Sequence, residues 1–145
     1  SNHVSFKLFT DGACLGNPGP GGWAYILRSE DGEVECSGGE TDTTNQRMEV
    51  TAVLRALESL EKPSKVEIYA DSQYVTKGLA EWMDGWIAKG WKNAAKKPVA
   101  NQDLWQPLAE LRKMHELSTH WVKGHDGHPE NERCDTLASA EAEQI

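Results

Sequence analysis

The sequence predicts an α/β fold in which helices cover the faces of a mixed β-sheet. Apolar and polar residues alternate in the first part of the chain, helical periodicity follows, and strand-like and helix-like segments then take turns. A chain of 145 residues has the length of one domain and can bury about two-thirds of its unfolded surface. We therefore expect residues 1–145 to form a single domain.

The expected elements follow the order strand, strand, strand, helix, strand, helix, helix, strand, helix. The strands are expected near residues 4–11, 21–28, 33–41, 65–71 and 118–123. A Gly/Pro-rich turn joins the first two, and Asp31-Gly32 turns the second into the third. A Trp/Lys-rich irregular segment separates the second helix from the third, and the helices are expected over about 44–61, from Ser72, over about 101–116 and from near Pro129.

Four acidic residues occupy positions where an acid usually has a specific role. Asp11 and Asp71 close predicted strands, Glu49 lies at the edge of an apolar helical stripe, and Asp135 lies inside the last helix. Strand ends and inner helix edges can converge, but four unrelated surface acids are an alternative from the spacing alone. Two carboxylates about 5 Å apart repel by roughly 3 kcal/mol at an effective dielectric near 20. A cluster would therefore need shared protons or a divalent cation, and an oxygen-only site favours magnesium or manganese over zinc.

The charge distribution and the cysteine content indicate which kind of ligand and which compartment to expect. The net charge is −8, yet the segment from Gly85 to Gln102 holds four lysines and no acid, so it carries +4 and the rest carries −12. A local basic patch on an acidic body is typical of a protein that touches a polyanion at one place. The three cysteines have no paired spacing, which indicates reduced thiols in the cytoplasm. Ser1 and Asn2, with no initiator Met, are expected to be a cloning remnant.

No stretch approaches the roughly 18 to 20 apolar residues of a membrane span, and the N-terminus shows no signal-like apolar run. We expect no membrane partner. Nothing in the sequence suggests more than a monomer.

Four motifs carry the acids: TDGACLGNPGPGG at 10–22, TTNQRME at 43–49, ADSQYV at 70–75 and WVKGHDGHPENERCD at 121–135. In this order they closely resemble the type 1 ribonuclease H family, of the bacterial ribonuclease HI type, from Phe9 to Asp135. The resemblance implies a ribonuclease H-like fold, a five-stranded mixed β-sheet flanked by α-helices, and one ribonuclease H catalytic domain over residues 1–145.

The resemblance also implies an activity, the endonucleolytic hydrolysis of the RNA strand of RNA–DNA hybrids to give 3′-hydroxyl and 5′-phosphate ends. Two Mg²⁺ ions, which Mn²⁺ could replace, would be bound by Asp11, Glu49, Asp71 and Asp135. Two such ions roughly 3.5–4 Å apart can activate water and stabilise the leaving oxygen. The alternatives are a non-catalytic RNA–DNA hybrid-binding module and a related nuclease that cuts DNA or double-stranded RNA.

His125 lies between two glycines in a loop, where a mobile imidazole can transfer protons near neutral pH. The motif favours a supporting catalytic role for this histidine, and the alternative is a surface loop residue. His128, just before Pro129, is expected to be structural.

Substrate contacts are also implied by the resemblance and divide between the two strands. The RNA strand, through its 2′-hydroxyls in the shallow minor groove, is expected to contact Cys14, Asn17, Asn45, Gln46 and Gln73. The DNA strand is expected to contact Thr44, Trp82, Trp86, Lys89, Trp91, Lys92 and Asn101. Each polar residue could instead be a turn or cap residue.

Tryptophans and one acid complicate this assignment. Trp82 and Trp86 could pack on the core, while Trp105 and Trp121 are expected to be core residues. Asp42 stands two residues before Thr44, where a basic neighbour would suit a phosphate pocket better. We therefore expect weaker or more salt-sensitive DNA-strand binding than in a more basic relative.

Overall fold

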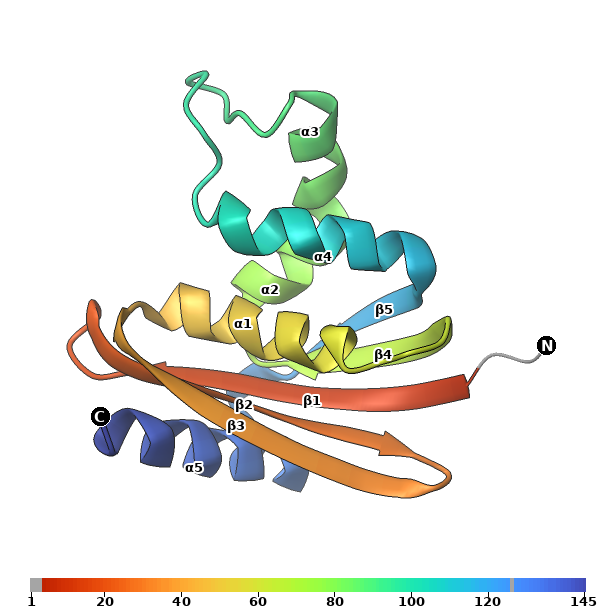
Figure 1. Cartoon of the computed structure of the whole chain (residues 1–145), viewed down its shortest axis with the longest axis vertical. Coiled ribbons are helices and arrows are strands. Elements are labelled where there is room, and N and C mark those ends of the chain that lie inside the picture. Colours follow the sequence, from red (N-terminus) through yellow and green to blue (C-terminus); the bar gives the residue numbers. More distant parts are fainter. Residues whose placement is uncertain (1–3, 126) are drawn as a thin grey trace.

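The computed structural model describes residues 4–125 and 127–145, and within them the chain forms one five-stranded sheet with helices on both faces (Figure 1). The strands are β1 (Val4–Cys14), β2 (Gly19–Ser29), β3 (Gly32–Thr43), β4 (Ser64–Ala70) and β5 (Glu116–Trp121). Their order across the sheet is β3-β2-β1-β4-β5. β1 is antiparallel to β2 and parallel to β4, and β4 is parallel to β5. The predicted α/β fold with a mixed sheet is confirmed. Ser1 and Asn2, the expected cloning remnant, lie outside the described residues.

Helices cover both faces of this sheet. The long helices α1 (Asn45–Glu58) and α4 (Gln102–Met114) lie on one face, and α5 (Pro129–Glu143) lies on the other (Figure 1). Between β4 and α4 come α2 (Gln73–Lys77), a π-helical turn (Gly78–Trp82) and α3 (Met83–Ala88). A 3-10 turn (Lys123–His125) follows β5.

Two hydrophobic clusters hold these layers together. The larger one joins the sheet to α1 and α4, and Leu8, Ile68, Leu57, Trp105 and Leu108 are fully buried in it. The smaller one packs α5 against the other face through Phe9, Ala24, Ile26, Cys134 and Ala138. The paired parts of β1 and β4 are therefore held between two helical layers.

Strand β1 is longer than the sequence predicted. Its parallel pairing with β4 ends at Thr10 opposite Ala70, but its antiparallel pairing with β2 continues to Cys14 opposite Gly21. Asp11 is thus inside the strand and not at its end, because β2 supplies a partner beyond the point where β4 stops. It is nevertheless the first residue past the parallel pair, which keeps it beside Asp71.

The Trp/Lys-rich segment is more regular than expected. Its first part is helical through the π-turn and α3, and the irregular part begins at Lys89, which caps α3. At Gly78 the chain passes so close to Trp105 that an added Cβ would lie 2.2 Å from the indole ring. A side chain at position 78 would displace this tryptophan from the core.

The prediction that Trp121 is a core residue is wrong. It is 47% exposed, whereas Trp105 is fully buried as predicted. Trp121 is the last residue of β5, which is one of the two edge strands of the sheet and has a strand on one side only.

The described helices include none that is both long and apolar enough to cross a membrane. All three cysteines belong to the described part of the chain and are free thiols.

Candidate active site

Three of the four predicted acids meet at the carboxyl end of the β1–β4 pair. Asp11 comes from β1, Glu49 from the second turn of α1, and Asp71 from the residue that follows β4. Each offers a carboxylate oxygen, and these oxygens lie within 4.8 Å of one another. The sequence prediction that acids from two strands and a helix converge is therefore correct for these three.

Gly12 allows this convergence. A Cβ at position 12 would lie 2.5 Å from the backbone nitrogen of Glu49 and 2.6 Å from the carbonyl carbon of Met48. Such distances are shorter than any van der Waals contact, so only glycine lets the start of α1 pack directly on β1. Thr44 fixes where α1 begins, since its hydroxyl accepts a hydrogen bond from the backbone N–H of Arg47 at 3.1 Å.

Burial makes two of these carboxylates, those of Asp11 and Glu49, costly to ionise. Asp11 is 3% exposed, and burial, reinforced by the charges of Asp71 and Asp135, raises its pKa from 3.8 to about 7. Burial and the neighbouring Asp11 charge raise the pKa of Glu49 well above its usual value. Oε1 of Glu49 is buried and accepts no hydrogen bond from the described residues. An all-oxygen donor set of this kind fits a hard divalent cation, whose charge would let Asp11 and Glu49 ionise.

Asp135 lies beside this group and not within it. It is exposed on α5, and it is not one of the three acids whose oxygens meet within 4.8 Å. Its charge nevertheless contributes to raising the pKa of Asp11, so it lies near the same site. Its role as a metal ligand stays a prediction.

Asn131 attaches α5 to the strands that carry the acids, a role that the sequence analysis missed. It is fully buried, and its amide donates to the carbonyl oxygens of Thr10 at 3.2 Å and Tyr69 at 3.0 Å. These carbonyls belong to the residues just before Asp11 and two before Asp71. Its position one helical turn before Asp135 was the signal that could have identified it.

The residues expected to contact RNA surround the Gly/Pro-rich turn and two helix N-termini. The thiol of Cys14 lies 3.5 Å and 3.4 Å from the carbonyl oxygens of Gly19 and Thr43, so it also closes the turn. Asn17 accepts a hydrogen bond from the backbone N–H of Asn45 at 2.9 Å, which supports the structural interpretation for its side chain. The remaining candidates, at the first turns of α1 and α2, are exposed: Asn45, Gln46 and Gln73.

The residues expected to contact DNA are partly joined by hydrogen bonds and ring contacts. Asn101 donates to the hydroxyl of Tyr74 at 3.1 Å, and the indole N–H of Trp105 donates to the same hydroxyl at 3.0 Å. Trp86 packs edge-on against Trp105 with ring centres 5.2 Å apart, so it belongs to the core margin. Trp82 is 38% exposed, so its indole is accessible, and its contact with DNA stays a prediction.

A family model for RNase H matches residues 3–143 of this chain. The chain belongs to the RNase H family. A protein of Halorhodospira halophila named Ribonuclease H is 56% identical over 139 residues, which is 96% of this chain and 93% of that protein. One of Brucella anthropi with the same name is 59% identical over 132 residues, or 91% and 86% of the two chains. The predicted family, its bacterial type and the enzyme class are confirmed.

Solved structures of this family share the fold. LC9-RNase H1, described as a type 1 RNase H with the type 2 active-site motif, aligns with a TM-score of 0.87 at 28% identity, over 99% of this chain and 74% of its own. LC11-RNase H1, solved in complex with an RNA/DNA hybrid, aligns at 0.72 and 23% identity, over 96% and 97%. The ribonuclease H-like fold is therefore confirmed.

The remaining catalytic candidate of this RNase H chain is His125. Its backbone ends the 3-10 turn Lys123–His125, and its side chain lies outside the part of the structure that is described. Its supporting catalytic role stays a prediction.

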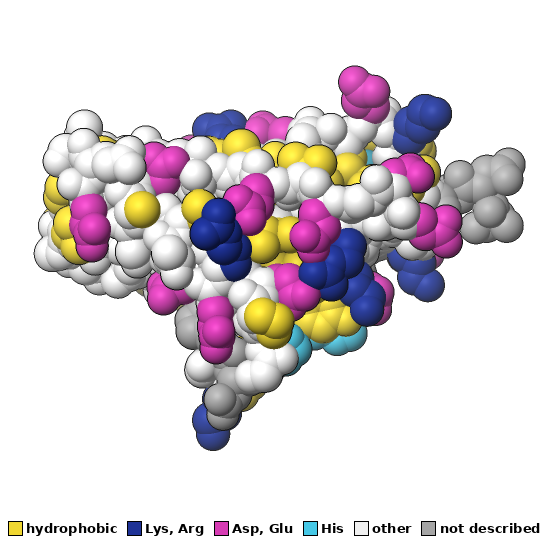
Figure 2. All heavy atoms as spheres, turned by 90° about the horizontal axis from the view of Figure 1, so that it is seen from below, with side chains coloured by type: hydrophobic (Ala, Val, Ile, Leu, Met, Phe, Trp, Pro, Cys, Tyr) yellow, Lys and Arg dark blue, Asp and Glu magenta, His cyan; other side chains and the backbone are white. Residues whose placement is uncertain are grey.

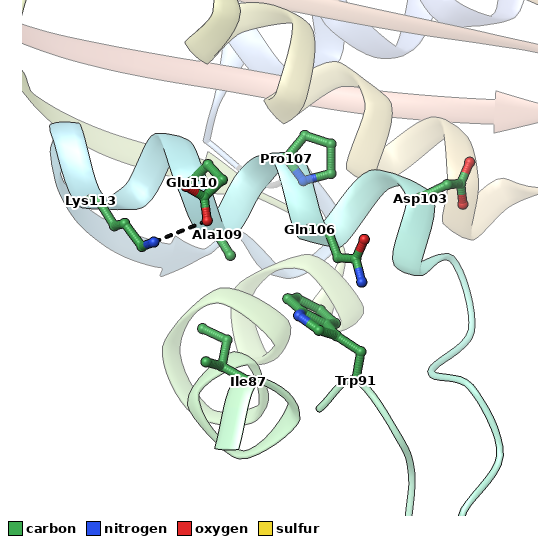
Figure 3. A pocket seen from close by; sticks show the side chains of 8 residues that line it. All are labelled: Ile87, Trp91, Asp103, Gln106, Pro107, Ala109, Glu110 and Lys113. Atoms are coloured by element: carbon green, nitrogen blue, oxygen red, sulfur yellow. Dashed lines mark hydrogen bonds and ion pairs between the residues drawn. The ribbon is translucent and has the colours of Figure 1, made fainter. Parts of the chain in front are cut away.

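A pocket of about 500 Å³ lies apart from the three acids, between α3, Trp91 and α4 (Figure 3). Figure 3 shows Ile87 and Trp91 on one side and α4 on the other, with Asp103 at one end. Its lining residues do not include the three acids, so the acids and this pocket are separate features.

The face of the domain on the side of α5 carries both signs of charge. Figure 2 shows acidic and basic side chains interspersed there. Some of them are paired across elements, as Arg133 is with Glu35 at 3.0 Å. A face that carries both signs of charge attracts a polyanion only weakly. The lysine segment after α3 is therefore the better candidate for DNA contact.

Proposed function

We propose that this RNase H family member is a magnesium-dependent endonuclease that hydrolyses the RNA strand of RNA–DNA hybrids and leaves 3′-hydroxyl and 5′-phosphate ends. The observation that carries this proposal is the meeting of carboxylate oxygens from Asp11, Glu49 and Asp71 within 4.8 Å at a buried site. A protein that only bound hybrids would gain nothing from three mutually repelling acids beside a polyanion.

Asp11, Glu49 and Asp71, joined by Asp135 from α5, would hold two Mg²⁺ ions, for which Mn²⁺ could substitute. Bound there, the ions would lower the pKa of a water, neutralise charge on the transition state and stabilise the departing 3′-oxygen. The contribution of the chain is to preorganise the acids: Gly12 sets the distance between β1 and α1, and Asn131 fixes α5 against both strands. His125 would move a proton during turnover or product release.

Substrate selection would come from the polar groups on either side of the acids. Amides of Asn45, Gln46 and Gln73, together with Cys14 and Asn17, would read 2′-hydroxyls of the RNA strand. The DNA strand would be contacted by Thr44, Asn101, Trp82, Trp86, Trp91, Lys89 and Lys92. The hybrid bound by LC11-RNase H1 supports this substrate. The three free thiols support a reducing compartment such as the cytoplasm.

The test is cleavage of a hybrid labelled on either strand, in Mg²⁺ and in EDTA, against single-stranded RNA and double-stranded RNA. Asp11→Asn protein, prepared in parallel, controls for a contaminating nuclease. We expect metal-dependent cutting of the RNA strand of the hybrid alone, absent in the variant, which still binds hybrid. Binding without cutting would favour the non-catalytic module, and cutting of a substrate with no 2′-hydroxyl at the scissile position would favour a different nuclease.

A further inference from the structure

Arg47, in the first turn of α1, connects two residues that were expected to contact the DNA strand. Its guanidinium donates to the side-chain carbonyl of Asn101 at 3.2 Å. Its backbone N–H donates to the hydroxyl of Thr44 at 3.1 Å. Thr44, Arg47 and Asn101 therefore form one continuous set of contacts where α1 and α4 begin.

The same guanidinium is held by a carboxylate. Arg47 donates to both oxygens of Asp103, at 3.0 Å and 2.7 Å, in the two-pronged geometry that guanidinium groups also use with phosphate. The Asp103 carboxylate thus occupies the end-on pair of donors that a phosphate could also use. Carboxylate and phosphate are competing ligands of a similar shape for this arginine.

The exposed fractions of the two side chains indicate which one can move out of the ion pair. Asp103 is 62% exposed and Arg47 is 28% exposed, so the acid is the partner more accessible to solvent. Figure 3 shows Asp103 at one end of the pocket beside α4, with its carboxylate pointing away from Ile87 and Trp91. Asp103 also lines the pocket of about 500 Å³, so open space adjoins its side chain.

Two further charges near this place are acidic. Glu40 is close enough for its charge to act on Arg47, and Asp42 is exposed two residues before the Thr44 cap. A phosphate arriving beside Thr44 and Asn101 would need a cation, and the guanidinium bonded to Asn101 is already in place to supply it.

We propose that Arg47 is the cation that binds a DNA-strand phosphate beside Thr44 and Asn101, and that Asp103 holds its guanidinium as an internal competitor when no hybrid is bound. This inference rests on the proposed hybrid substrate and adds a binding residue and a restraint on affinity. Each hybrid that binds exchanges one ion pair for another, so Asp103 lowers affinity while keeping Arg47 in place.

The test measures binding of a fluorescent hybrid by anisotropy in EDTA, where no cleavage occurs, for Arg47→Gln, Asp103→Asn and the double variant. We expect Arg47→Gln to bind about 5- to 20-fold more weakly and to lower the salt slope by about one. Asp103→Asn should bind about 3- to 10-fold more tightly, because the competitor is removed. In the Arg47→Gln background, Asp103→Asn should change affinity by less than about twofold, because the arginine that it released is absent.

Arg55 and Glu58 provide a matched control on the same helix. They form an ion pair at 2.8 Å, with side chains 48% and 43% exposed, near the opposite end of α1. Arg55→Gln and Glu58→Gln change the net charge as the test variants do and should leave affinity within about twofold. Thermal melts of all variants verify folding, and Arg47→Lys, which keeps the charge and loses the fork, should fall between wild type and Arg47→Gln.

Hybrids with a single methylphosphonate at successive positions locate the contact. We expect the ratio of wild-type to Arg47→Gln affinity to fall to about one when one particular DNA-strand phosphate is neutral, and to persist for every RNA-strand substitution. The inference is overturned by equal affinity of Arg47→Gln and wild type, by a full Asp103→Asn effect in the double variant, or by loss of the ratio at an RNA-strand phosphate. If the wild type binds hybrid but does not cut it, the proposed nuclease activity fails while these binding results still decide the role of Arg47.

Discussion

The indole N–H of Trp121 donates a hydrogen bond to the backbone carbonyl of Asp71 at 2.9 Å. Trp121 ends β5, and Asp71 follows the last residue of β4, so this contact continues the pairing of the two strands past Ala70 opposite Trp121. The edge strand of the sheet therefore helps to fix one of the three acids. The indole remains 47% exposed while it does so.

Replacement of Trp121 by phenylalanine tests this contact. The variant keeps an aromatic ring and loses one hydrogen bond, worth about 1 kcal/mol, so Asp71 should be held less firmly. We expect about fivefold lower activity at limiting Mg²⁺ and near-normal activity at saturating Mg²⁺, as measured by a Mg²⁺ titration of hybrid cleavage. An unchanged titration curve in a variant with unchanged Tm would show that the hydrogen bond does not position Asp71.

The buried acids should make the metal-free protein less stable as the pH rises. The folded-state pKa of Asp11 is about 7 against an ordinary 3.8, and that of Glu49 is raised in the same direction. The proton that the folded state binds more tightly stabilises it fully below about pH 4, and this stabilisation is lost as the pH rises through about 7. In EDTA we expect the Tm to fall between pH 5.5 and pH 8, on the basis of the Asp11 shift.

Asp11→Asn is the matched variant for this pH effect. The neutral amide cannot ionise, so at pH 8 in EDTA the variant should be more stable than wild type by a few kcal/mol, on the order of the roughly 1.4 kcal/mol expected per pKa unit. The buried ring of His115 has a lowered pKa and acts in the opposite direction, so the difference between the two proteins is the quantity to measure. Mg²⁺ at pH 8 should raise the Tm of wild type more than that of the variant. Parallel curves of Tm against pH for the two proteins would contradict the raised pKa of Asp11.

Gly12→Ala should separate β1 from α1. Its Cβ would need the space of the Glu49 and Met48 backbone, so we expect a loss of about 1–3 kcal/mol in stability together with a large loss of cleavage activity. Gly85→Ala is the control, because position 85 lies in α3 with nothing within 4 Å of the added carbon. That variant should be up to about 1 kcal/mol more stable, with normal activity. Urea unfolding and hybrid cleavage of both proteins decide the matter, and a Gly12→Ala protein with wild-type activity would refute the spacing argument.

Sequence patterns were sufficient for the elements and for three members of the acid cluster. Alternation and capping residues are local properties, and they placed Asp11, Glu49 and Asp71 on elements whose ends meet. They did not reveal that β1 runs past Asp11, because this depends on how far β2 continues beside it. Strand length is set by the partner strand as well as by the strand itself.

The sequence patterns did not predict contacts between elements that are distant in the chain. Arg47 meets Asn101 and Asp103 across more than fifty residues, and nothing in the TTNQRME motif indicates which helix its side chain faces. Trp121 was expected in the core, and nothing in the local sequence around it indicates what covers its side chain. Long-range contacts of this kind require the packed structure.

The lysines of the irregular segment carry four positive charges on a chain whose remainder carries −12. Lys89 caps α3, and Lys92 forms an isolated bridge with Pro98, so both are attached to ordered backbone. Each of Lys89→Gln and Lys92→Gln should weaken hybrid binding severalfold and lower the salt slope by about one. Lys65→Gln, at the opposite end of β4 and paired with Glu116 at 3.9 Å, removes the same charge and should leave the slope unchanged. Anisotropy titrations at several salt concentrations would measure all three. Equal effects at the three positions would mean that net charge, and not this segment, determines binding.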